Sequence, residues 1–212
     1  MKLISFYLIL VFVSWFDCTL AQPKVDPNGY NTFYHSNGNI SSEGNLQEGK
    51  PNGYWKTYYS NGVLKSQGNR INFELDSVWK FYSDSGLIEN EIRYKNNKKN
   101  GFSNVYDSLG NLVSTCNYIQ NQKNGEELIF YPNGSIKQRT SYNQGRKDGN
   151  SSVYNESGIV SLKEDFVEGF LNNREEVNRV DVDGAKTGLW KEYYDNGKEK
   201  WVGNFKNGKI EG

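Results

Sequence analysis

The stretch GYWKTYYSNG at residues 53–62 decides the fold of this chain, because GLWKEYYDNG repeats it at residues 188–197. Between the two copies, glycines recur every 24 residues, and one longer step of 39 residues leads to the last of them. A fixed period of this length is typical of stacked supersecondary units. We expect a turn at each glycine of this series: Gly38, Gly62, Gly86, Gly110, Gly134, Gly158 and Gly197.

An aromatic residue stands four positions before each of these glycines. An aliphatic residue follows most of the glycines by two positions, as Leu64 follows Gly62. Large apolar side chains at a fixed place in every strand predict a packed spine, with ligand binding by stacked rings as the alternative. The predicted aromatic spine consists of Tyr34, Tyr58, Tyr82, Tyr106, Phe130, Tyr154 and Tyr193.

Each unit has the pattern of a β-hairpin, because Asn-Gly pairs bounded by aromatic and β-branched residues favour tight turns. A second glycine, such as Gly53, opens most units and predicts the turn between neighbouring hairpins. Connections this short make consecutive strands antiparallel neighbours. We therefore predict an all-β, elongated meander, a single twisted sheet of 24-residue hairpins. After a short lead at 22–28, the array covers 29–212, with units starting near 29, 53, 77, 101, 125, 149, 173 (shortened) and 188.

The unit G-x-W-x-x-Y-Y-x-N-G-x-L, seen at 53–62 with the residues that follow and again at 188–212, resembles the MORN repeat. More closely, it is similar to the bacterial variant in YwqK-like antitoxin proteins. The resemblance covers about residues 29–212, although Ser103, Glu127 and Ser151 replace tryptophan in the middle units. It implies a hairpin ribbon that acts as an interaction surface or scaffold without catalysis, and it implies, as an alternative, an antitoxin or immunity-type protein for a co-encoded toxin.

The first 21 residues differ from the repeats. Lys2 precedes the apolar run LISFYLILVFVSWF, and Thr19 and Ala21 fit the small residues before a signal-peptide cleavage point. We predict a signal peptide at 1–21 and export to the periplasm, cell envelope or extracellular space, with a retained signal anchor as the alternative. The chain carries 25 basic and 25 acidic residues, a balance that argues against nucleic acid as a partner.

Catalytic chemistry has little support in the sequence. His35 is the single histidine, which argues against a His-based dyad or a multi-His metal site within one chain. Cys116 stands on the expected core face, where a small apolar role is favoured over that of a nucleophile. We predict no enzyme activity, no catalytic residues, no metal and no cofactor.

A protein partner is the expected ligand, with a carbohydrate or lipid headgroup held by exposed aromatic residues as the alternative. Partner specificity is expected at variable exposed positions, among them Lys56, Lys80, Asn104, Leu128, Ser152 and Lys191. A mild excess of lysines in the last unit offers weak support for membrane contact, and unpaired edge strands favour self-association. The less regular aromatic positions complete the expected partner surface: Trp55, Tyr59, Trp79, Trp190 and Tyr194.

Overall fold

The computed structural model describes residues 24–194 and 198–211, so the predicted signal peptide at 1–21 lies outside the described residues. Within these ranges the chain consists of strands and turns, and no helix there is long and apolar enough to cross a membrane. The strands are β1 (Tyr30–Tyr34), β2 (Ile40–Gln47), β3 (Lys50–Tyr58), β4 (Leu64–Ile71), β5 (Glu74–Tyr82), β6 (Ile88–Lys95), β7 (Lys98–Tyr106), β8 (Leu112–Ile119), β9 (Gln122–Phe130), β10 (Ile136–Asn143), β11 (Arg146–Tyr154), β12 (Val160–Val167), β13 (Phe170–Glu176), β14 (Arg179–Val180), β15 (Lys186–Tyr193), β16 (Glu199–Lys206) and β17 (Lys209–Glu211).

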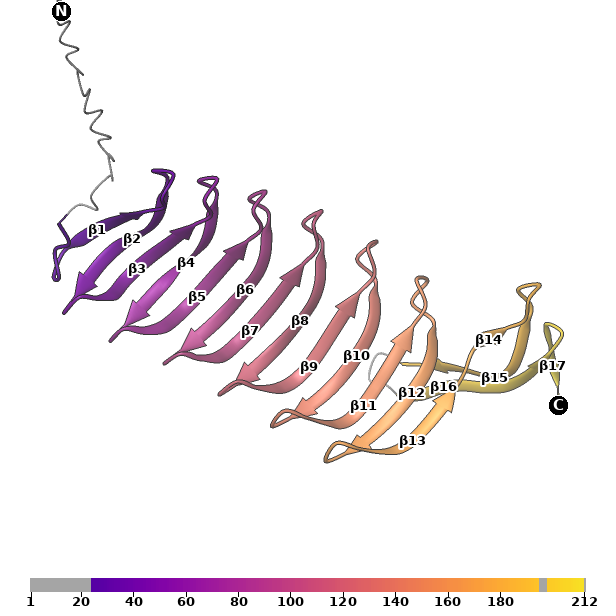
Figure 1. Ribbon diagram of the computed structural model, residues 1–212. Coiled ribbons are helices and arrows are strands. Elements are labelled where there is room, and N and C mark those ends of the chain that lie inside the picture. The colour runs from indigo at the N-terminus through magenta and orange to yellow at the C-terminus, as the bar shows by residue number, and fades with distance from the viewer. Residues whose placement is uncertain (1–23, 195–197, 212) are drawn as a thin grey trace, which may run out of the picture.

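The predicted antiparallel meander is confirmed. A 13-stranded sheet runs in sequence order from β1 to β13, and a 4-stranded sheet holds β14 to β17. In Figure 1 the strands of the larger sheet curl strongly, and the hairpins lie side by side like the steps of a ladder. Every strand of the larger sheet pairs with the strands next to it in sequence, as short connections require.

Two kinds of turn alternate along the larger sheet. The longer turn holds the Asn-Gly pair: the Gly62 N–H donates to Tyr59 O over 2.9 Å, and Gly62 has a φ of 86°. This left-handed backbone is open to glycine without a Cβ clash. Gly38, Gly86, Gly110, Gly134 and Gly158 adopt the same conformation, whereas Gly197 lies outside the described residues. The shorter turn is a two-residue hairpin such as Asn96-Asn97, with φ values of 51° and 61°.

The second glycine of the unit does not make the turn that we expected. Gly53 lies inside β3, where the pairing with β2 shifts, and its φ is 81°. It therefore forms a β-bulge, in which one strand carries extra residues opposite its partner. The turn between these hairpins lies at Glu48-Gly49, before β3 begins. Ser77 occupies the bulge of β5 with a φ of 60°, a conformation that glycine adopts with less strain.

The single sheet that the repeats predict divides in two after β13. The larger sheet ends in the shortened unit, where β13 pairs with β12 and has no pairing with β14 or β15; β15 pairs with β14 and β16 in the second sheet. Between β13 and β14 the chain turns sharply at Asn178, whose φ is 57°, next to the fully buried Val177. One strand, β15, then lies between the longer turn at 181–185 and the hydrogen bond from Tyr194 N–H to Lys198 O, where a full unit has two strands. The missing strand explains why the second sheet cannot continue the first.

The buried centre of the array contains the tryptophans of the repeat. Leu46, Trp55 and Trp79 form a buried cluster, against which the half-buried Phe33 and Phe81 pack. Trp79 is only 3% exposed, and its Nε1–H donates to Asn69 O over 2.8 Å. A glycine in the preceding strand makes room for this ring, because a Cβ on Gly68 would lie 2.3 Å from Trp79 Cδ2. The array thus buries a tryptophan ring in one sheet by placing a glycine beside it.

Candidate interaction surface

The larger sheet has two chemically different faces. Side chains alternate across a strand, so Trp55 and Lys56 in β3 lie on opposite faces. We call the face that carries Trp55, Trp79, Ile92 and Cys116 the tryptophan face. The opposite face, which carries Lys56, Lys80 and Asn104, is called the polar face.

The tryptophans that we expected on the partner surface are buried, so that expectation is wrong for them. Trp55 is 7% exposed, Trp79 is 3% exposed and Trp190 is 9% exposed. The physical reason is that glycines on the neighbouring strands leave room for the large rings. Gly44 and Gly68 lie opposite Trp55, and Gly203 lies opposite Trp190. In the middle units the serines that replace tryptophan, Ser103 and Ser151, are also buried.

Lysines and aromatic rings alternate along the tryptophan face next to the shorter turns. The Nζ atoms of Lys99, Lys123 and Lys147 lie 4.6–5.0 Å from the ring centroids of Tyr118, Tyr142 and Phe166, each one repeat further on. Such contacts contribute about 0.5–1 kcal/mol each at exposed sites. They occupy the ring faces that a quaternary ammonium ligand would need. These lysine–aromatic contacts therefore stabilise the packing of neighbouring repeats and do not form a ligand site.

The column predicted as the aromatic spine lies on the polar face and is not the buried centre. Tyr34 is 39% exposed, and Tyr58 is half-buried. Each ring except Tyr193 lies opposite the aliphatic residue that follows the turn, as Tyr58 pairs with Leu64, whereas Tyr193 pairs with Glu199. The shift between Thr57 and Tyr58 is a β-bulge that changes the alternation of side chains, so Leu64 and Arg70 face opposite sides. The rest of the column is also half-buried: Tyr82, Tyr106, Phe130, Tyr154 and Tyr193.

The centre of the polar face carries one continuous cross-strand row of polar and charged side chains. Lys56 pairs with Gln67, Gln67 with Lys80, and Lys80 with Glu91 across successive strands. Lys80 Nζ lies 3.3 Å from Glu91 Oε1, and Thr115 Oγ1 donates to Asn104 Oδ1 over 2.7 Å. The row contains the variable positions named from the sequence except Lys191, which lies in β15, and it continues through the apolar Leu128 to Arg139, Ser152 and Lys163. We call it the polar row.

The tyrosine column adds hydroxyl groups to the polar row. Tyr58 Oη donates to Glu43 Oε1 over 2.5 Å, and Gln67 Nε2 donates to Tyr82 Oη over 2.6 Å. The Tyr58 hydrogen bond lowers the pKa of the Glu43 carboxyl, with Lys56 as a further cause. The polar row is therefore held in place by neighbouring repeats, as a binding surface on a rigid scaffold requires.

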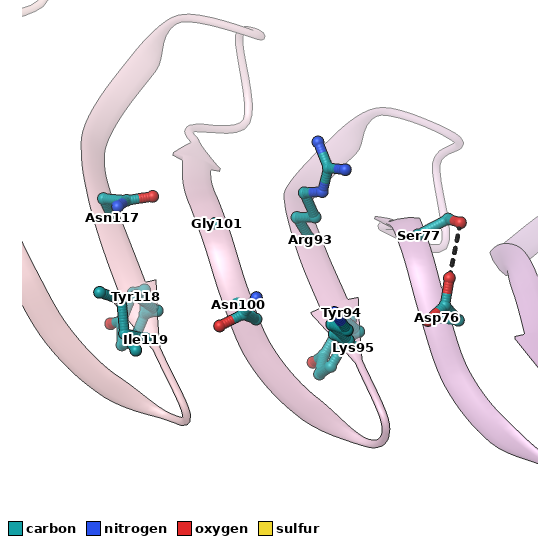
Figure 2. A pocket seen from close by; sticks show the side chains of 10 residues that line it. All are labelled: Asp76, Ser77, Arg93, Tyr94, Lys95, Asn100, Gly101, Asn117, Tyr118 and Ile119. Carbon is teal, nitrogen blue, oxygen red and sulfur yellow. Dashed lines mark hydrogen bonds between the residues drawn. The ribbon is translucent and has the colours of Figure 1, made fainter.

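Hollows on the sheet also lie on the polar face. Figure 2 shows one, in which Arg93 and Asn117 stand at equivalent places of neighbouring repeats on either side of Gly101. The bulge glycine places no side chain between them, which leaves a hollow of about 540 Å³. Asp76 also lines it and accepts a hydrogen bond from Ser77 Oγ over 2.9 Å. This hollow offers shape for a partner rather than a reacting group.

The longer turns are joined to each other by side chains in the position after the tyrosine column. Tyr59 Oη donates to Tyr82 O and Tyr131 Oη donates to Tyr154 O, each over 2.8 Å. His35 holds the equivalent place, with Nε2 3.0 Å from Tyr58 O. His35 and Tyr59 therefore connect successive turns, although Tyr59 was expected on the partner surface. Tyr194, which is 55% exposed, is the one member of that predicted set with a largely free ring.

Cys116 does not have the environment of a nucleophile. It is buried on the tryptophan face, and its Sγ–H donates to Asn117 O over 3.3 Å. Burial raises the pKa of its thiol, and the Glu127 carboxylate adds to the rise. Among the described residues, no group of three or more His, Cys, Asp or Glu side chains is placed to hold a metal ion.

A second concavity lies where the two sheets meet. A cleft of about 880 Å³ separates the polar face of β9–β12 from the end of β15, and we call it the inter-sheet cleft. Its walls include Arg139, Lys163 and Tyr154 on one side and Lys191 and Tyr193 on the other. Nothing in the repeat pattern predicts it, because it exists only where the shortened unit turns the second sheet over the first. The irregular step from Gly158 to Gly197 was the one sequence signal of this place.

Comparison with known proteins supports the repeat. A family model described as MORN repeat variant matches residues 27–48, 51–72, 123–144 and 186–198. The first three matches each span one hairpin of the larger sheet, and the fourth covers β15. No curated protein sequence matches the chain. The chain is thus similar to MORN repeats at four places, and the matches do not extend to the YwqK-like subfamily.

Proposed function

We propose that this protein is an exported, non-enzymatic scaffold that binds a protein partner through its polar face. The observation that carries the proposal is the polar row: variable side chains at fixed spacing on a sheet whose other face holds the buried side chains. Both concavities described above lie on the same face. A firm array with one variable face suits recognition of an extended protein surface.

The test is capture of partners by the purified protein from the native envelope fraction, compared with charge-reversal variants. Lys56→Glu and Lys80→Glu change the charge of the polar row, and both side chains are about half exposed, at 40% and 44%. The control is Lys137→Glu, whose exposed lysine lies near a turn outside the row. A partner lost with the two row variants and kept with the control supports the proposal. Equal capture by all variants contradicts it.

Export is part of this proposal and rests on residues 1–21 alone. Sequencing of the N-terminus of the protein recovered from cell fractions tests it directly. A mature chain that begins near Gln22 in an exported fraction is the expected result, and an intact N-terminus in the cytoplasmic fraction contradicts it.

Edge pairing between copies is a further element of the proposal. The larger sheet ends at β13, which has no second partner strand among the described residues. The first two residues of this edge strand are exposed, Phe170 at 77% and Leu171 at 50%. Unpaired, apolar edges favour strand addition. Light scattering at micromolar concentration is expected to show a dimer that Leu171→Lys dissociates. A monomer at all concentrations contradicts edge pairing without affecting the scaffold proposal.

A further inference from the structure

The inter-sheet cleft differs from the rest of the polar face because two sheets enclose it. Tyr154 and Ile159 contribute from the larger sheet, and Tyr193 and Tyr194 from the end of β15. Uncharged polar side chains stand between these rings: Ser141, Asn150 and Ser152. Aromatic rings beside hydroxyl and amide groups are the usual lining of a site for a small polar ligand.

The charged groups in and around the cleft balance. Arg139 Nη1 lies 3.2 Å from Glu126 Oε1, which pairs these two side chains. Lys191 Nζ lies 2.9 Å from Glu175 Oε2 and 2.6 Å from Glu199 Oε1, so this lysine has two carboxylate partners. The Lys163 ammonium offsets the second carboxylate at longer range. Glu192, which also lines the cleft, lies 3.7 Å from Lys200 Nζ, so the cleft has no surplus charge to attract an ionic ligand.

The cleft also contains hydrogen-bond donors that lack an acceptor. Tyr193 Oη and Arg139 Nε are buried and have no hydrogen-bond partner in the described part of the chain. Burial raises the pKa of Tyr193, so its hydroxyl keeps its proton and is a donor. Buried donors without a partner are rare in folded proteins, and a ligand that brings acceptors would satisfy them.

We propose that the inter-sheet cleft binds an uncharged oligosaccharide. Sugar hydroxyls accept hydrogen bonds from Tyr193 and Arg139, while the C–H faces of the sugar ring pack against the tyrosine rings. Arg139 Nε can only donate, whereas Tyr193 Oη can donate or accept, and a sugar hydroxyl, which also donates and accepts, can pair with either group. An anionic ligand finds no surplus positive charge. The cleft overlaps the far end of the polar row at Arg139, Ser152 and Lys163, but Lys56 and Lys80 do not line it, and sugar binding does not depend on the proposed protein partner.

Access to the Tyr193 hydroxyl requires one side chain to move. Lys163 Nζ lies 3.8 Å from the centroid of the Tyr193 ring and covers it. Within the described residues, Lys163 forms no salt bridge, so few contacts hold its flexible stem in place. We expect Lys163 to swing aside when the sugar binds, and Lys163→Ala to bind the sugar at least as tightly as the unchanged protein.

The experiment is binding of the purified protein to an array of neutral and acidic oligosaccharides, followed by calorimetry with the neutral oligosaccharide that the array identifies. Tyr193→Phe removes the unmatched hydroxyl and keeps the ring, and it should weaken binding about fivefold. Tyr59→Phe is the matched control, because that hydroxyl donates to Tyr82 O away from the cleft. It should leave the affinity unchanged.

The proposal is overturned if no neutral oligosaccharide binds, if only acidic ones bind, or if Tyr193→Phe and Tyr59→Phe bind the neutral ligand equally. A protein partner that Tyr193→Phe releases, with no sugar bound, would place a polypeptide in the cleft and also overturn it. Thermal melts of both variants check that a loss of binding does not come from unfolding of the variant. Loss of partner capture by the polar-row variants with intact sugar binding separates this proposal from the scaffold function.

Discussion

Asn178 and Lys191 exchange two hydrogen bonds: Lys191 N–H donates to Asn178 Oδ1 over 2.7 Å, and Asn178 Nδ2 donates to Lys191 O over 2.9 Å. The same Nδ2 group donates to Val160 O at the start of β12 over 2.8 Å. One amide side chain thus takes the place of a pairing strand beside β15 and ties the second sheet to the first.

Replacing Asn178 with alanine should loosen the second sheet. The change leaves the Lys191 N–H and the Val160 carbonyl without these partners, at a cost of about 2 kcal/mol in the free energy of unfolding. Hydrogen exchange should become faster in β15 and β16 and stay unchanged in β3–β6. The comparison variant is Asn172→Ala, whose side chain reaches only the exposed Asp165 carboxylate. Equal exchange in the two variants contradicts the role of Asn178.

Gly68→Ala should destabilise the array, because the new Cβ would lie 2.3 Å from Trp79 Cδ2. Overpacking of this kind costs about 1–3 kcal/mol. Chemical denaturation measures the loss. In a Trp79→Leu background the same glycine change should cost much less, because the two positions share one volume. Additive effects of the two substitutions would show that the ring and the glycine are not matched.

Ser77→Gly should stabilise the protein. Ser77 has a φ of 60° at the bulge where glycines stand in most other repeats. Relief of the left-handed strain contributes about 1 kcal/mol, partly offset by the greater freedom of glycine in the unfolded chain. The melting temperature should rise for Ser77→Gly and fall for Ser114→Gly, where the serine is in an ordinary strand position of β8. A lower melting temperature for both variants would be evidence against strain at Ser77.

The Tyr58–Glu43 hydrogen bond should make part of the stability dependent on pH. The folded state lowers the pKa of Glu43 below its ordinary value of 4.5, with Tyr58 as the largest cause. Stability from this group is therefore complete above the ordinary pKa and is lost as the pH falls through the folded-state pKa.

The measurement is the free energy of unfolding of the unchanged protein and of Glu43→Gln between about pH 6 and about pH 3. The difference between them should be largest at the upper end and shrink toward the lower end. Tyr58→Phe should behave like Glu43→Gln, and Tyr59→Phe should show a difference that does not vary with pH. A Glu43→Gln difference that is constant over the whole range rules out the predicted coupling.

The period, the hairpins and the antiparallel order could be predicted from the sequence, because turn glycines and aromatic columns recur at one spacing. The buried face could not be assigned from the same columns. A bulge near Tyr58 changes the alternation, so even spacing between Leu64 and Arg70 does not place them on one face. A usable signal was present in Gly44, Gly68 and Gly203, small residues that stand opposite tryptophans and mark them as buried.

The inter-sheet cleft was beyond prediction for a different reason. Its walls come from β9–β12 and β15, and their meeting depends on how a shortened unit turns the chain at Asn178. The sequence shows that this unit is shorter than the other repeats, but it does not show in which direction the following strand runs. Unmatched donors such as Tyr193 Oη arise only from that packing.

The most direct test of partner binding by the polar face uses two neighbouring positions of β7. Asn104 lies in the polar row, and Val105, which is 37% exposed, points to the tryptophan face. A photo-crosslinking residue is introduced at either position, and the protein is irradiated with the captured partner. We predict a crosslink from position 104 and none from position 105. A crosslink from position 105 alone, or equal yields from both, would contradict recognition through the polar face.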